Sequence, residues 1–215
     1  LTRRGRVWIR RHFRFGRRAM WGNLLADINT RVDILILGIF TSDATVGIYS
    51  FAALIAEGFS QLAIVFRNVV NPRLARYHAE RPTVELEGKL RYGMALTYKV
   101  TVPLGAALVL AFPLIVSLLK VGSEYLAAWP VFAVLMAGIT ASMGYSAFQM
   151  LLNKGGFPGY QSAFFALTFA TNVALNLLLI PVWGMMGSAI ATGLTFIMSI
   201  WYIRLLVWKA MRIRM

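Results

Sequence analysis

The sequence contains no cysteine, only two histidines and only 8 acidic residues among its 215 positions. Without cysteine the chain can form neither a disulfide nor a thiolate metal site. Charged residues account for 14% of the sequence and hydrophobic residues for 59%, whereas soluble domains average roughly 25% and 45–50%. This shortage of charge argues against a soluble enzyme, a disordered tail and a fibrous repeat. The mean hydropathy of +0.66 indicates a membrane protein.

Long runs of the sequence carry no charge. The run from 155 to 203 has neither an acidic nor a basic residue, and the turn-forming segment Pro181–Met185 divides it. A membrane-spanning helix needs about 20 mostly apolar residues, so this run alone holds two spans. The same reasoning along the chain predicts an all-α polytopic membrane bundle. The six expected transmembrane helices are 19–40, 44–66, 96–119, 126–150, 161–180 and 186–207.

Basic residues gather on one side of this predicted topology. The net charge is +14, and twenty of the 22 Lys and Arg residues lie before residue 19, in 67–99, at Lys154 or after residue 203. Cytoplasmic loops of membrane proteins collect Lys and Arg, so we predict that these segments and both ends of the chain are cytoplasmic. The expected parts are a basic cytoplasmic linker (1–18), a six-helix transmembrane lobe (19–208) and a basic cytoplasmic tail (209–215).

The Arg-rich first 18 residues have two other interpretations. A nucleic-acid-binding arm or an Arg-rich transit peptide would show a similar composition. A cytoplasmic linker that touches lipid headgroups explains the same residues and also fits the other basic loops, so we expect no nucleic-acid partner. The first residue is Leu1 rather than Met, and we expect further sequence to precede it.

Small residues recur at helical spacing in two of the predicted spans. Residues four apart share one face of a helix, and small side chains there let two membrane helices approach closely. In the third span, Pro103 and Pro113 each free a backbone carbonyl and favour a kink. The predicted contact faces are Gly187, Ala191, Thr195 and Ser199 in the last span, and Ala133, Ala137 and Ala141 in the fourth.

The first predicted span has a polar face. A charge at the centre of a membrane helix costs roughly 2.5–3.5 kcal/mol on insertion scales, so its charges need partners or water. Asp27 and Arg31 are four apart and can pair with each other. Alternatively they line an aqueous cavity in which Arg31 meets an anionic headgroup. The residues of this face are Asn23, Asp27, Thr30, Arg31 and Asp33.

The other predicted spans carry fewer polar side chains. Glu57 and Gln61 are four apart in the second span, where Glu57 can bind a cation or proton or neutralise Arg31 across the helix interface. Neutral stripes in the fourth and fifth spans are more typical of hydrogen bonds between helices than of ligand sites. These stripes are Ser142, Ser146, Gln149 and Asn153, then Thr168, Asn172 and Asn176.

The sequence has no evident catalytic constellation. Both histidines, His12 and His78, fall in predicted cytoplasmic segments, and the sequence has neither a phosphate-cradling loop nor a nucleophile elbow. We therefore expect a protein that is not an enzyme and that uses no cofactor and no metal.

Three groups of motifs resemble those of the oligosaccharide-lipid flippases. This family is the polysaccharide-transporter branch of the multidrug/oligosaccharidyl-lipid/polysaccharide exporter superfamily, which also holds multidrug and toxin extrusion transporters and lipid II flippases. The resemblance covers about residues 14–207 and is most specific in the third group. The groups are Arg31–Gly38 with Val46–Tyr49 and Ala56–Gly58, then Pro113–Leu119 with Gly122–Tyr125, then Asn176–Thr192.

The resemblance implies two similar six-helix lobes around a central cavity that opens alternately to each side of the membrane. This chain would be the C-terminal lobe, and the N-terminal lobe of the same protein would be its partner. The implied activity is transport of undecaprenyl-diphosphate-linked oligosaccharide across the bacterial cytoplasmic (inner) membrane. That step serves surface polysaccharides such as the O-antigen of lipopolysaccharide. Membrane lipids and a polysaccharide polymerase are further expected partners.

The resemblance also suggests roles for the polar residues. Cationic cavity residues in the family are thought to engage the diphosphate, which makes Arg31 the first expected substrate contact. A cation-coupled multidrug exporter and a lipid II flippase are alternatives within the superfamily, and a non-transporting membrane scaffold is an alternative outside it. The expected substrate site is Arg31, Asn23, Asp27 and Gln61, with Asp33 and Glu57 for ion coupling or charge balance.

Overall fold

The described part of the chain is a bundle of helices, which confirms the predicted all-α membrane fold. The computed structural model describes residues 13, 16, 20, 24–80, 83–145, 152 and 156–212, without the side chains of 63–64, 66–80, 83–87 and 89–90. A helical segment at 24–29 precedes the first labelled helix. The labelled elements are α2 (Val32–Phe40), α3 (Asp43–Glu80), α4 (Thr83–Leu118), the 3₁₀ helix η1 (Ser123–Ala128), α5 (Trp129–Met143) and α7 (Pro158–Met211).

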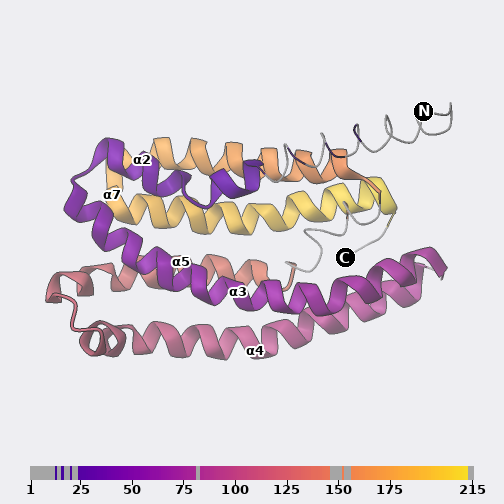
Figure 1. Cartoon of the computed structure of the whole chain (residues 1–215), viewed down its shortest axis with the longest axis horizontal. Coiled ribbons are helices and arrows are strands. Elements are labelled where there is room, and N and C mark those ends of the chain that lie inside the picture. Colours follow the sequence, from indigo (N-terminus) through magenta and orange to yellow (C-terminus); the bar gives the residue numbers. More distant parts are fainter. Residues whose placement is uncertain are drawn as a thin grey trace.

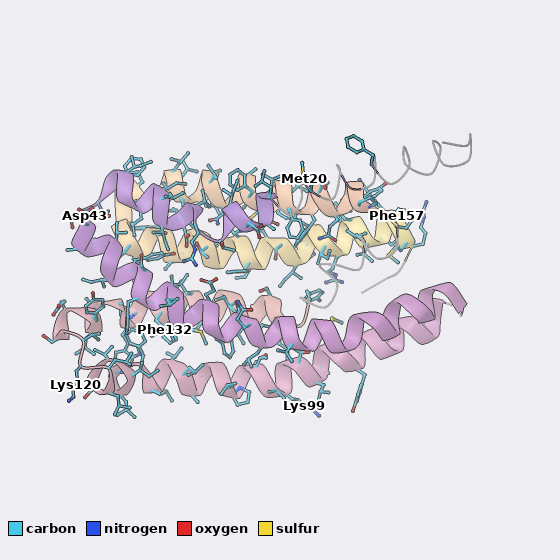
Figure 2. The ribbon with its side chains drawn as sticks, viewed as in Figure 1. Met20, Asp43, Lys99, Lys120, Phe132 and Phe157 are labelled. Atoms are coloured by element: carbon cyan, nitrogen blue, oxygen red, sulfur yellow. The ribbon has the colours of Figure 1, made fainter. Side chains whose placement is uncertain are left out.

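The helices lie roughly side by side along the long axis of the molecule (Figure 1). The α5 helix packs on both α4 and α7, and α2 packs on α7. The labelled residues Asp43 and Lys120 lie at one end of the bundle, whereas Lys99 and Phe157 lie toward the other (Figure 2). Among the described residues, three segments are long and apolar enough to cross a membrane: Arg91–Leu118, Ser123–Met143 and Pro158–Met211.

The helices α3 and α4 are longer than the sequence predicted. The second span was predicted to end at residue 66 and the third to begin at 96, with a loop between them. Instead α3 continues to Glu80 and α4 begins at Thr83, so the hairpin reaches beyond the ends of α5 and α7 (Figure 1). Arg, Lys, Glu, Leu and Ala are all good helix formers, so a charged segment does not end a helix.

The α7 helix contains two of the predicted spans. A straight helix of its 54 residues would be about 80 Å long, far more than a bilayer core of about 30 Å. Gly184 interrupts it with φ 54° and ψ −132°, a conformation that glycine adopts without the steric cost of a Cβ atom. The predicted turn at 181–185 is therefore present, while the two helices extend outward to Pro158 and Met211.

The fourth predicted span differs at both ends. It begins one turn earlier, as η1 at Ser123, and the regular α5 helix ends at Met143. The predicted continuation through 146–150 lies outside the described residues, and so do Ser146, Gln149 and Asn153 of its polar stripe.

Aromatic rings fill the core where α4 contacts α5. Between α5 and α7, the two helix backbones approach each other closely. Phe112 and Phe132 stack with ring centroids 4.7 Å apart, and both are fully buried. A Cβ atom added to Gly138 would lie 2.5 Å from the Cα of Gly193, so the two backbones meet there. The α5–α7 interface thus depends on glycine at position 138, whereas a Cβ atom at Gly193 would come no closer than 3.5 Å to a neighbouring atom.

Of the two predicted small-residue faces, the one on α7 is buried and the one on α5 is not. Gly187, Ala191, Thr195 and Ser199 are all buried, as expected for a helix contact face. On α5, by contrast, Ala137 is exposed and its neighbours at four-residue spacing are only half-buried, so the tight contact runs through Gly138 instead. The alanine face lines an open groove between α4 and α5.

The backbone carbonyl that Pro113 leaves without a helical partner accepts a hydrogen bond from a side chain. Proline lacks an N–H, so the carbonyl of Val109, four residues earlier, has no partner within the α4 helix. The indole Nε1–H of Trp129 donates a hydrogen bond to this Val109 oxygen at 2.7 Å. In an environment without water, an unpaired carbonyl is costly, and this bond therefore ties η1 and α5 to α4.

Trp129→Phe is expected to lower the stability of the protein by about 1–3 kcal/mol, because it leaves the Val109 carbonyl without a donor. Thermal unfolding in detergent measures this loss. In a Pro113→Ala background the helix supplies its own N–H to Val109, so the same Trp129→Phe change should be milder. Equal losses in the two backgrounds would show that the indole acts only through packing.

Candidate functional site

The first polar segment is a broken helix rather than the continuous one predicted over 19–40. The backbone N–H groups of Thr30 and Arg31 bond back to the carbonyls of Asp27 and Ile28, at 3.3 and 3.1 Å. These hydrogen bonds join residues three apart, as in a 3₁₀ helix, whereas an α-helix joins residues four apart. The α-helix therefore ends here. The Thr30 hydroxyl also donates to the Asp27 carbonyl at 2.7 Å and thereby reinforces the turn. Arg31 lies at this break, immediately before α2.

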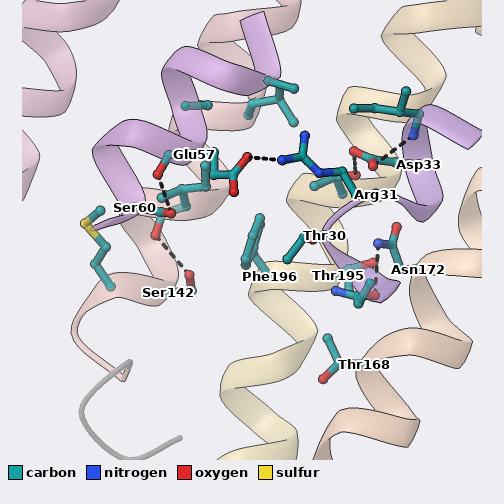
Figure 3. A pocket seen from close by; sticks show the side chains of 18 residues that line it. Thr30, Arg31, Asp33, Glu57, Ser60, Ser142, Thr168, Asn172, Thr195 and Phe196 are labelled. Atoms are coloured by element: carbon teal, nitrogen blue, oxygen red, sulfur yellow. Dashed lines mark hydrogen bonds and ion pairs between the residues drawn. The ribbon is translucent and has the colours of Figure 1, made fainter. Parts of the chain in front are cut away.

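Arg31 reaches from this break across to α3. Its Nη2 atom lies 3.4 Å from Oε2 of Glu57, and the two side chains are 57% and 37% exposed (Figure 3). Of the two partners considered for Arg31, Glu57 is therefore the one with which it pairs, and Asp27 on the same helical segment is not. The pair is open to solvent, so its net contribution to stability is small. A phosphate can therefore reach the guanidinium.

Asp33 occupies a different environment from Arg31. Its side chain is only 7% exposed, and its Oδ1 atom accepts the N–H of Ile34 at 2.9 Å. Its Oδ2 atom accepts the hydroxyls of Tyr49 at 2.6 Å and Thr192 at 3.4 Å. One carboxylate thus joins α2, α3 and the second half of α7.

Asparagine side chains form a second polar network beside the first. The Nδ2 atom of Asn172 donates to Oδ1 of Asn29 at 3.1 Å. Asn176 in turn donates to Oδ1 of Asn172 at 2.6 Å and accepts the hydroxyl of Ser188 at 3.0 Å. Asn176, Ser188 and Thr192 belong to the third resemblance motif. That motif therefore supplies side chains to both networks.

A cavity of about 260 Å³ lies between the helix break, α3, α5 and α7 (Figure 3). It brings together the break residue Arg31, the buried Asp33 and the α3 residue Glu57. Its other polar lining comes from hydroxyl and amide side chains, and apolar residues complete its wall. The polar lining residues are Asn29, Thr30, Arg31, Asp33, Glu57, Ser60, Ser142, Thr168, Asn172, Thr192 and Thr195.

The cavity includes some of the predicted site residues and leaves out others. Arg31, Asp33 and Glu57 all line it. Asp27 and Gln61 are exposed and do not line it, and Asn23 lies outside the described residues. The sequence-based site did not include Asn29 or Thr192. Thr168 and Asn172 were interpreted as helix-to-helix hydrogen-bonding residues, but both also line the cavity.

The lining of the cavity carries charges of both signs. Two carboxylates and one guanidinium line the cavity, a formal charge of −1 when all three are ionised. Within the residues that the structure describes, no three His, Cys, Asp or Glu side chains come together as metal ligands. The site offers charge, hydroxyls and amides to a small polar ligand.

Two solved transporters of the MOP superfamily share this fold over almost the whole chain. One is a transporter from Pyrococcus furiosus whose reversed pocket polarity suggests a different function, with TM-score 0.69, 19% identity and coverage of 93% of this chain. The other is a multidrug resistance transporter of the MATE family in an outward-facing conformation, with TM-score 0.67, 18% identity and the same coverage. The chain spans 44% of the length of each transporter.

Sequence comparisons give a more specific result. No curated protein is significantly similar to this chain in sequence. The family model for polysaccharide biosynthesis proteins, however, matches residues 3–130. This match includes the helix break, Arg31, Asp33, Glu57 and the α3–α4 hairpin. Since the match covers more than half of the sequence, the chain belongs to the polysaccharide biosynthesis protein family.

Proposed function

We propose that this chain is the C-terminal lobe of a flippase that moves undecaprenyl-diphosphate-linked oligosaccharide across the bacterial inner membrane. The family match supports a role in polysaccharide synthesis, and the shared fold supports a multi-pass transporter of the MOP superfamily. The chain spans 44% of each solved transporter, which agrees with one lobe of two. The product of this step would feed a surface polysaccharide such as the O-antigen of lipopolysaccharide.

The observation that carries this proposal is the accessible guanidinium of Arg31 beside a polar cavity. A guanidinium presents a planar set of N–H donors that matches two phosphate oxygens at once. Glu57 balances its charge at 3.4 Å. A diphosphate would displace this carboxylate, because it carries more negative charge and offers more acceptor oxygens.

The size of the cavity defines which part of the substrate it can take. Pockets for drug-sized ligands enclose about 300–1,000 Å³. At about 260 Å³ the cavity has room for a phosphate-containing headgroup and is smaller than such pockets. The sugar chain would therefore lie outside this cavity, between this lobe and the rest of the protein.

The charge balance of the lining favours a second role at the same site. Asp33 and Glu57 together outweigh Arg31, so the cavity attracts a cation or proton when no anion is bound. We propose that these carboxylates couple transport to an ion gradient. The same balance supports the alternatives of a cation-coupled multidrug exporter and a lipid II flippase. A scaffold that recruits a polymerase would need no such polar cavity.

The proposed function predicts a specific defect in cells. Deleting the gene for the full-length protein should abolish the surface polysaccharide while lipid-linked oligosaccharide accumulates at the cytoplasmic face of the membrane. A scaffold would instead leave single repeat units exported but unpolymerised. Drug sensitivity with normal surface polysaccharide would favour the multidrug exporter.

The proposed orientation places both ends of the chain in the cytoplasm, and reporter fusions test it. Reporters placed after Met215 or between Glu80 and Thr83 should be cytoplasmic, while one inserted at Lys120 should be external. The physical reason is the gathering of Lys and Arg on one side. Cytoplasmic activity of the Lys120 fusion would overturn the proposed orientation.

A further inference from the structure

The last three turns of α7 and the residue that follows them, Arg212, carry a basic and aromatic stripe. Trp201 is 66% exposed and Trp208 40% exposed, and the basic residues between and after them are exposed as well. Residues three or four apart share one face of a helix, so these side chains line up along one side of α7. We call this surface the α7 stripe: Trp201, Arg204, Leu205, Trp208, Lys209 and Arg212.

Within the stripe each tryptophan is paired with an arginine. The Arg204 guanidinium carbon lies 5.7 Å from the ring centroid of Trp201, and that of Arg212 lies 5.4 Å from the ring centroid of Trp208. These are cation–π distances, and stacking holds each guanidinium beside an indole ring. The two pairs are separated by seven or eight residues, or about 11 Å along the helix axis.

The side of α7 opposite the stripe is buried against the rest of the bundle, and this packing fixes the direction in which the stripe faces. Ile203, Leu206, Val207 and Met211 are buried in one apolar cluster together with Phe164 from the first half of the helix. The side of α7 that carries the stripe therefore points away from the core of this chain. Closer to the middle of the helix, the exposed residues Leu194, Ile197 and Met198 are all apolar.

We propose that the α7 stripe binds an anionic phospholipid of the surrounding bilayer. Its acyl chains would lie against the apolar segment 194–201, and its phosphate would contact Arg204, with Lys209 and Arg212 adding positive charge. This order of apolar, aromatic and basic residues matches the order of hydrocarbon, interface and headgroup in one leaflet. The stripe residues include three cations and no acid, so a phosphate meets no repulsion there.

Charge complementarity selects an anionic lipid over a zwitterionic one. Each Lys or Arg near a membrane surface contributes roughly fivefold to the binding of an anionic lipid. Indole rings prefer the interface, and their pairing with Arg204 and Arg212 keeps the guanidinium groups at headgroup level. None of the stripe residues lines the cavity that contains Arg31, so the proposed lipid site is distinct from it.

Quenching of tryptophan fluorescence by brominated lipids tests the proposal in nanodiscs that contain the full-length protein. A minor fraction of brominated phosphatidylglycerol should quench more strongly than the same fraction of brominated phosphatidylcholine. The Trp201→Phe/Trp208→Phe variant should lose this difference, which assigns it to the stripe. Arg204→Gln/Arg212→Gln should reduce the preference for the anionic lipid by about fivefold or more.

The matched control is Arg91→Gln/Lys99→Gln, which removes two exposed cations from α4 and should keep the preference. Equal quenching by both brominated lipids, or an equal loss in the control, would overturn the proposal. Absence of quenching by either lipid would mean that another protein surface covers the stripe, and this would overturn it too. Millimolar inorganic phosphate in phosphatidylcholine nanodiscs should not alter the fluorescence, and an effect there would identify a soluble anion as the ligand.

Discussion

Arg31→Ala is expected to abolish surface polysaccharide in a complementation assay while leaving the amount of protein in the membrane near normal. The variant removes the charge-assisted contact proposed for the diphosphate, which is worth about 1.5–3 kcal/mol. That corresponds to a loss of transport of about 10- to 150-fold, which the assay would register as little or no surface polysaccharide. Arg31→Lys should recover only part of the activity, because an ammonium cannot contact two phosphate oxygens with the planar geometry of a guanidinium.

The ion pair with Glu57 provides the control for this prediction. If Arg31 served only to neutralise Glu57, the double variant Arg31→Ala/Glu57→Gln would leave no unpaired charge and would restore activity. If Arg31 binds substrate, the double variant stays inactive. Asp27→Asn is the matched single change, because Asp27 is exposed and outside the cavity, and it should have little effect. Rescue by the double variant would assign Arg31 a structural role.

Gly138→Leu is expected to destabilise the bundle by about 3 kcal/mol or more. Even a Cβ atom at Gly138 would lie 2.5 Å from the Cα of Gly193, so a leucine must push α5 and α7 apart. Overpacking of a tight contact costs about 1–3 kcal/mol, and here the obstacle is backbone, which cannot rotate away. Thermal unfolding in detergent and the yield of folded protein both measure the effect.

The same substitution at a glycine without neighbours gives the comparison. Gly58 lies in α3, where an added Cβ would meet no atom within 4 Å. Gly58→Leu should be neutral or slightly stabilising, since leucine forms helix better than glycine by roughly 1 kcal/mol. A loss of stability at Gly58 as large as at Gly138 would mean that the α5–α7 contact is not the cause.

The sequence predicted the turns between helices better than the ends of the long helices. Apolar runs and basic segments report the lipid boundary, and the turns near Ser42, Lys120 and Gly184 appear where they were expected. Helix ends depend on backbone hydrogen bonds instead. The α3 helix continues to Glu80 because charged residues support a helix in water as well as apolar ones do in lipid.

The candidate site was predictable in part. Arg31, Asp33 and Glu57 were prominent because charges in a span are costly, and all three line the cavity. The helix break at Thr30 was not anticipated, and Arg31, which follows it, pairs with Glu57 rather than Asp27. The contribution of Thr192 depends on how α7 folds back on α2, and local spacing in the sequence does not contain that information.

The most direct test is a translocation assay with the full-length protein in sealed vesicles. A fluorescent polyprenyl-diphosphate-linked oligosaccharide is supplied in one leaflet, and a glycosidase outside the vesicle reports its arrival in the other. The account predicts that the protein accelerates this arrival, that Arg31→Ala removes the acceleration, and that a polyprenol without the diphosphate is not moved. An equal rate for the wild-type protein, the Arg31→Ala variant and protein-free vesicles would contradict it.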